Sequence, residues 1–78
     1  WAYYLVDDYI KAEEFLKRAV QLMPDDPIVN DHYGDILWKL DRKIQARYFW
    51  SMVLKMEDAE KDLLDQIKNK LISGPQNT

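Results

Sequence analysis

Apolar residues recur three or four positions apart along most of the chain, the spacing of one face of an α-helix. Between these stretches stand polar or helix-ending residues such as Asp7, Pro24, Asp41 and Gly74. The pattern predicts an all-α protein whose short connections make neighbouring helices antiparallel. The five expected helical segments are residues 1–6, 9–23, 27–40, 43–56 and 58–72.

The helix boundaries rest on capping residues. Asp8 is expected to cap residues 9–23, and Asp26 followed by Pro27 is typical of an N-cap and a first helical position. The boundary near Asp58 is less marked, because neither Pro nor Gly separates residues 43–56 from 58–72. We favour a break there. The alternative is one continuous helix about 45 Å long, which would seek a second chain and give a swapped dimer.

Shifting the chain by 34 positions against itself aligns several identical residues. The identical pairs are Asp7 with Asp41, Ile10 with Ile44, Ala12 with Ala46, and Phe15 with Phe49. A fixed period of this length is typical of stacked helical hairpins, which are stabilised by the packing of one hairpin on the next.

The residues at these positions resemble the tetratricopeptide repeat family. Its small residues at helix crossings are matched by Gly34 and Ala46 in one repeat and by Ala12 and Ala19 in the preceding one, with Pro24 as the closing proline. Trp50 and Leu16 occupy the family's large apolar position, and Phe15 and Phe49 are the adjacent packing residues of the two repeats. The chain departs from the family at the turns, where Asp7 and Asp41 replace a frequent Gly, and at Asn30 and Lys68.

The resemblance implies a right-handed α-solenoid of about 1.8 repeats with a C-terminal capping helix. One truncated and one full repeat would occupy residues 1–57, the capping helix residues 58–72, and a flexible tail residues 73–78. The chain begins in the middle of the pattern and without Met, so we interpret it as a piece of a longer product.

By family position, a concave groove would be lined by aromatic and acidic residues. They are Trp1, Tyr4, Asp31, Asp35 and Trp38. Such a groove favours a protein or peptide segment with basic and apolar side chains, and it has the wrong charge for the chaperone tails that some members of the family grip. The alternative is that the carboxylates are solvated and Trp38 covers a repeat boundary. Tyr48 is a possible interface residue, or else it lies against the capping helix or is simply exposed.

The composition and motifs of the chain argue against several classes of function. The net charge of −3, with both signs interspersed, argues against a nucleic-acid-binding face. His32 is the only histidine, and no cysteine is present, so we expect neither a metal site nor a cofactor. No catalytic motif occurs, and no apolar run reaches the length of a membrane span. Cytoplasm and periplasm both remain open.

The sequence therefore predicts a non-enzymatic scaffold that binds a protein or peptide through its groove. Two alternatives remain. The chain is a structural module that self-associates as a homodimer, by end stacking or by a helix swap, or it is a spacer within a larger protein.

Overall fold

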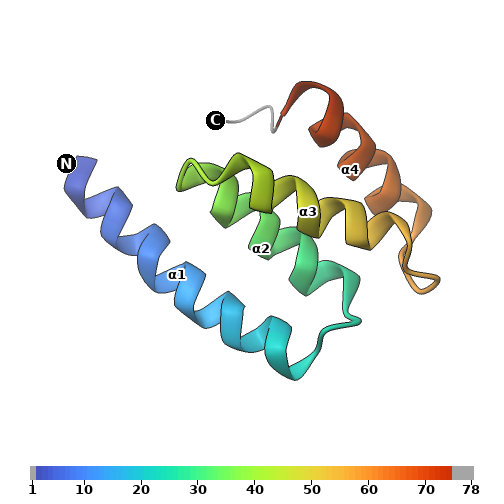
Figure 1. Cartoon of the computed structure of the whole chain (residues 1–78), viewed down its shortest axis with the longest axis horizontal. Coiled ribbons are helices and arrows are strands. Elements are labelled where there is room, and N and C mark those ends of the chain that lie inside the picture. The colour runs from blue at the N-terminus through green and yellow to red at the C-terminus, as the bar shows by residue number, and fades with distance from the viewer. Residues whose placement is uncertain (1, 75–78) are drawn as a thin grey trace.

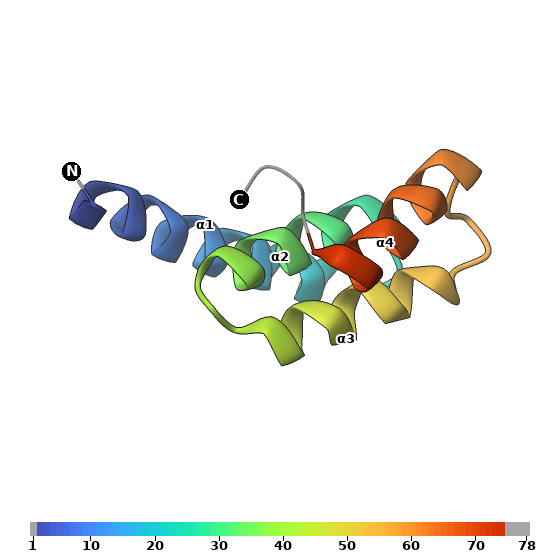
Figure 2. The same ribbon diagram turned by 90° about the horizontal axis from the view of Figure 1, so that it is seen from above.

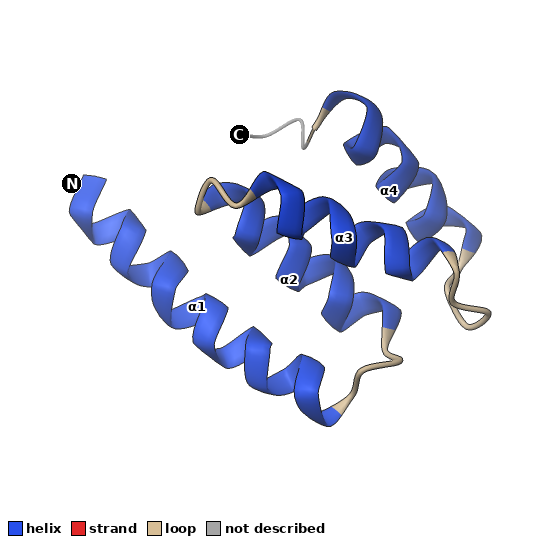
Figure 3. Cartoon of the chain, in the orientation of Figure 1, coloured by secondary structure: helices blue, strands red, loops and turns tan. Residues whose placement is uncertain are grey.

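The computed structural model describes the backbone of residues 2–74 and the side chains of residues 8–74. Four helices follow one another: α1 (Ala2–Leu22), α2 (Pro27–Lys39), α3 (Lys43–Leu54) and α4 (Lys61–Ser73) (Figure 1). The described residues contain no strand (Figure 3), so the predicted all-α class is confirmed. Each helix packs on the next, and α1 and α4 lie on opposite sides of the α2–α3 pair (Figures 1 and 2).

The N-terminal helix differs from the prediction. Residues 1–6 and 9–23 were expected to be two helices separated at Asp7 and Asp8, but α1 runs without interruption from Ala2 to Leu22. Asp disfavours a helix interior by only about 0.7 kcal/mol relative to Ala, which is too little to end a helix whose neighbours favour one. Its equivalent in the next repeat, Asp41, has a left-handed backbone (φ 64°) and does end α2.

The boundaries of α2 follow from its capping residues, as predicted. The Asp26 carboxylate accepts hydrogen bonds from the backbone N–H groups of Ile28 and Val29, at 2.9 and 3.2 Å, and Pro27 occupies the first turn. The Asn30 amide donates to the backbone carbonyl oxygens of Pro24 and Asp26. These bonds satisfy polar groups of the connection, and they explain why a polar residue, Asn30, is buried here.

The predicted break between the fourth and fifth expected helices, residues 43–56 and 58–72, is confirmed. The backbone N–H groups of Lys55 and Met56 donate to the carbonyl oxygens of Met52 and Val53, which tightens and ends α3. The chain then runs to Glu60, whose extended backbone precedes α4. Asp58, where this helix was expected to begin, lies within the connection, and Glu60 is the N-cap. A single helix across residues 43–72 does not form.

The core lies where α2, α3 and α4 meet. Its fully buried side chains are Leu37, Ala46, Trp50, Val53 and Ile67. At Gly34 an added β-carbon would lie 2.4 Å from Nε1 of Trp50, so only glycine allows the indole to pack there. The Trp50 indole N–H donates to the backbone oxygen of Asp31 at 3.3 Å. Gly34, Ala46 and Trp50 are thus buried at this helix crossing, whereas their role in packing one repeat on the next stays a prediction.

The outer side of α1 is less well covered. Ala12 and Ala19 are half-buried, but Phe15 is 74% exposed. Its equivalent Phe49 is half-buried and packs against the Tyr33 ring, with the ring centroids 4.7 Å apart. Among the side chains of residues 8–74, Phe15 makes no comparable ring contact.

Candidate protein-binding surfaces

Two of the predicted groove residues are joined by a lysine from the C-terminal helix. Asp31 and Asp35 lie one turn apart on α2, and the Lys70 ammonium of α4 sits between them. Its Nζ is 2.9 Å from Oδ1 of Asp31, 2.9 Å from Oδ1 of Asp35 and 3.1 Å from Oδ2 of Asp35. Asp31 is only 6% exposed, so the prediction of a freely accessible acidic pair does not describe this arrangement.

The third groove residue on α2 also contacts the end of α4. A β-carbon added at Gly74 would lie 2.8 Å from Cζ2 of Trp38, so the backbone at the end of α4 rests on the Trp38 indole. Trp38 has two further neighbours. Its ring centroid lies 5.6 Å from that of Trp50 and 5.1 Å from Nζ of Lys43. The structure shows Trp38 packed between Trp50 and the end of α4, whereas the alternative prediction, that Trp38 covers a repeat boundary, stays a prediction.

The remaining two groove residues are at the N-terminal end. Trp1 lies outside the described residues, and for Tyr4 only the backbone, within α1, is described. The described residues of the predicted stripe are Asp31, Asp35 and Trp38. Asp31 and Asp35 contact Lys70 of α4, and Trp38 contacts Gly74 at its end. Lys70 takes the place that a basic side chain of a ligand would take.

The charges of this cluster respond to burial and to each other. Burial raises the pKa of the Asp35 carboxyl, and the hydrogen bond and charge of Lys70 only partly oppose this effect. Burial alone would lower the pKa of Lys70, but its hydrogen bonds to Asp31 and Asp35 outweigh burial and raise it. The Lys70 ammonium is thus favoured in its charged form. The charged form of the Asp35 carboxylate is favoured less, because Lys70 does not fully offset the cost of burying it.

A separate surface lies on the outer side of α3. Ile44, Tyr48 and Met52 follow one another at intervals of four residues and are 87%, 60% and 37% exposed. Such spacing places them on one side of the helix. Arg47 and Lys55, three positions after Ile44 and Met52 respectively, are also exposed. We refer to these five residues as the α3 face. Tyr48, predicted as a possible interface residue, is exposed and meets the Phe49 ring edge-on at 5.3 Å.

A cleft of about 650 Å³ adjoins the α3 face on the side of α1. Its residues are Glu13, Lys17, Tyr33, Arg42, Ile44, Gln45, Tyr48 and Phe49. The Tyr33 hydroxyl donates to Oε2 of Glu13 at 3.1 Å, and Nη1 of Arg42 lies 3.6 Å from Oε1 of Glu13. Burial raises the pKa of Tyr33, and the hydrogen bond to Glu13 raises it further. The cleft combines an aromatic floor with a charged rim.

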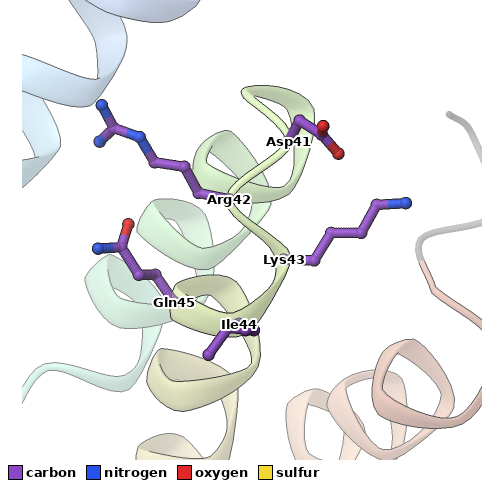
Figure 4. Close-up of a pocket in the computed structure, with 5 residues that line it drawn as sticks. All are labelled: Asp41, Arg42, Lys43, Ile44 and Gln45. Carbon is purple, nitrogen blue, oxygen red and sulfur yellow. The ribbon is translucent and has the colours of Figure 1, made fainter.

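The turn between α2 and α3 extends this cleft. Residues 41–45 border a hollow of about 400 Å³, and Arg42 and Gln45 extend from it toward α1 while Asp41 and Lys43 point away (Figure 4). Ile44 belongs to the hollow, the cleft and the α3 face. The three features therefore form one continuous surface.

A second cleft, of about 400 Å³, lies between the beginnings of α2 and α4. It contains His32 together with Asp31, Asp58, Glu60 and Asp62. Among the described side chains of residues 8–74, no three His, Asp or Glu residues are placed to hold a metal ion. The described helices also include none with the length and hydropathy of a membrane span.

Sequence reasoning missed the basic character of the α3 face. The charges of the whole chain are mixed, but residues 42–55 contain four basic residues and no acidic one. They are Arg42, Lys43, Arg47 and Lys55, of which Arg47 and Lys55 belong to the α3 face and Arg42 borders the cleft. This local run was visible in the sequence, whereas the pairing of Lys70 with α2 depends on how α4 folds back and was not.

Comparison of the chain with protein-family models, with curated proteins and with solved structures finds no significant match. Its function is therefore inferred from the geometry of the described residues.

Proposed function

We propose that the chain is a non-enzymatic helical scaffold that binds another protein through the α3 face and the adjoining cleft. The observation that supports this proposal is the exposed row of Ile44, Tyr48 and Met52 beside an aromatic cleft. Contiguous exposed apolar side chains mark interaction sites more often than isolated ones do. Tyr, Met and Arg are also enriched in protein–protein interfaces.

The packing of the helices supports a scaffold role. Each helix packs on its successor, and the close crossing at Gly34 and Trp50 is typical of stacked helical hairpins. Such packing is what the resemblance to tetratricopeptide repeats implies. The right-handed solenoid is part of this proposal.

The proposed partner site differs from the predicted groove because of Lys70. A basic ligand on α2 would have to displace an ammonium that already makes three short contacts with Asp31 and Asp35. The α3 face requires no such displacement, since its apolar side chains are exposed. A helix swap has less support, because α3 and α4 are separate helices within one chain.

The proposal is tested by placing a photo-crosslinking phenylalanine derivative at position 48 and, as a matched control, at position 68. Both positions are exposed, but Lys68 lies on α4. In extract of the native host, irradiation should give a discrete adduct of the chain with another protein from position 48 only. Adding Ile44→Asp should abolish that adduct. Equal adducts from both positions, or none from position 48, would contradict the proposal.

A further inference from the structure

We infer that the partner presents an acidic amphipathic helix to the α3 face; this inference rests on the proposed function of that surface. Three properties of the surface point to such a segment. They are its charge, the spacing of its apolar side chains, and the shape of the cleft beside it.

The charge of this region is opposite to that of the rest of the chain. Residues 42–55 hold four of the eleven basic residues and none of the fourteen acidic ones, hence a net charge of +4. All other residues together hold seven basic and fourteen acidic side chains, hence a net charge of −7. Complementary charge steers association and suppresses unsuitable partners. Arg47 and Lys55 on the α3 face and Arg42 at the cleft would therefore attract a partner segment rich in Asp or Glu.

The apolar residues set the length of the segment that fits. Ile44, Tyr48 and Met52 span eight positions of α3, about 12 Å along the helix axis. A partner helix with apolar residues at intervals of three or four positions covers the same length in about two turns. Arg47 and Lys55 lie beside this row, where they meet carboxylates on the flanks of such a helix.

The cleft favours a helix over a flat surface. Its floor, formed by Tyr33 and Phe49, lies below the exposed side chains of Ile44 and Tyr48. The planar surface of a bilayer does not reach such a floor, whereas a side chain of a docked helix does. The one acidic residue that borders the cleft, Glu13, already accepts from Tyr33 and faces Arg42, which reduces its repulsion of an acidic partner.

The experiment uses the full chain and two synthetic helical peptides. Both carry the same row of Leu residues, flanked by Glu in one peptide and by Lys in the other. We expect the Glu peptide to bind about tenfold more tightly than the Lys peptide by fluorescence anisotropy, and to bind more weakly as salt is raised. In backbone amide spectra of the labelled chain, its shifts should be concentrated in residues 42–55.

Two charge reversals provide the matched control. Arg47→Glu should weaken binding of the Glu peptide about tenfold, whereas Lys68→Glu, the same change of charge on exposed α4, should alter it less than about twofold. Circular dichroism of both variants establishes that they keep their helices. An equal effect of the two reversals would overturn the inference, because it would mean that only the net charge of the chain matters.

The remaining outcomes separate this inference from the proposed function. Equal binding of both peptides at residues 42–55 would leave the α3 face as a protein-binding site and overturn the acidic character of its partner. Tighter binding to phosphatidylglycerol vesicles than to the Glu peptide would assign the face to a membrane surface and overturn it as well. Absence of peptide shifts together with absence of a crosslink from position 48 would remove both proposals.

Discussion

The Trp50 indole occupies the space beside the α-carbon of Gly34, where any other residue would place its β-carbon. Replacing Gly34 by Ala adds about 1 kcal/mol of helix propensity but forces a methyl group against Nε1 of a fully buried Trp50. Overpacking of this kind costs about 1–3 kcal/mol. We expect Gly34→Ala to lower the free energy of unfolding by up to about 2 kcal/mol in urea denaturation, with Gln45→Ala, on the exposed surface, changing it by less than about 0.5 kcal/mol. A more stable Gly34→Ala chain would contradict the described crossing.

Lys70 is the second residue at which a single substitution is informative. Lys70→Met would leave the carboxylate of buried Asp31 without its cation, and Asp35 would lose two hydrogen bonds. Because Lys70 and Asp35 are partly exposed, we expect a loss of about 2 kcal/mol rather than the 3–5 kcal/mol typical of a fully buried pair. Lys68→Met, on the exposed side of the same helix, should cost little.

The difference in unfolding free energy between the wild-type chain and Lys70→Met should also depend on pH. A lysine whose pKa is higher in the folded than in the unfolded chain stabilises the fold while it is protonated, and this contribution is lost as pH rises through the folded pKa. Since the pKa of Lys70 is raised above 10.5, the difference in unfolding free energy between wild type and Lys70→Met should shrink as pH increases beyond that value. A difference that stays constant to high pH would show that Lys70 acts by packing alone.

At the level of elements, local signals predicted α2, α3 and the break before α4, but not the continuity of α1. Capping at Asp26 and the left-handed turn at Asp41 are decided within a few residues, so the sequence was sufficient for them. Asp7 and Asp8 look similar to such signals, yet they lie inside a helix. Identical residues at equivalent repeat positions, Asp7 and Asp41, therefore adopt different backbones.

The continuity of α1 is tested by Asp8→Ala. Within a continuous helix, this change should leave the free energy of unfolding unchanged or raise it by up to about 0.7 kcal/mol, because Ala has the higher helix propensity. If Asp8 instead capped a helix beginning at Tyr9, the same change would cost about 1 kcal/mol. Asp8→Pro provides the complementary measurement: it should reduce the helical circular dichroism signal, since Pro removes an internal hydrogen bond of α1.

At the level of the whole molecule, the arrangement of charge decides which surface is available. The resemblance to tetratricopeptide repeats directed attention to Asp31, Asp35 and Trp38, and the packing positions Gly34 and Trp50 were predictable from it. The pairing of Asp31 and Asp35 with Lys70 was not predictable, because Lys70 lies 35 to 39 positions further along the chain. Contacts over such distances depend on the path of the connection before α4, which no local pattern specifies.

The central claim is that the α3 face binds a different protein and not a second copy of this chain. Light scattering on a size-exclusion column, over a dilution series of the chain alone, tests it most directly. We expect the molar mass of the monomer, 9.4 kDa, at every concentration. A persistent dimer that Tyr48→Asp converts to monomer would contradict the claim, because the α3 face would then be occupied by a second copy of the chain.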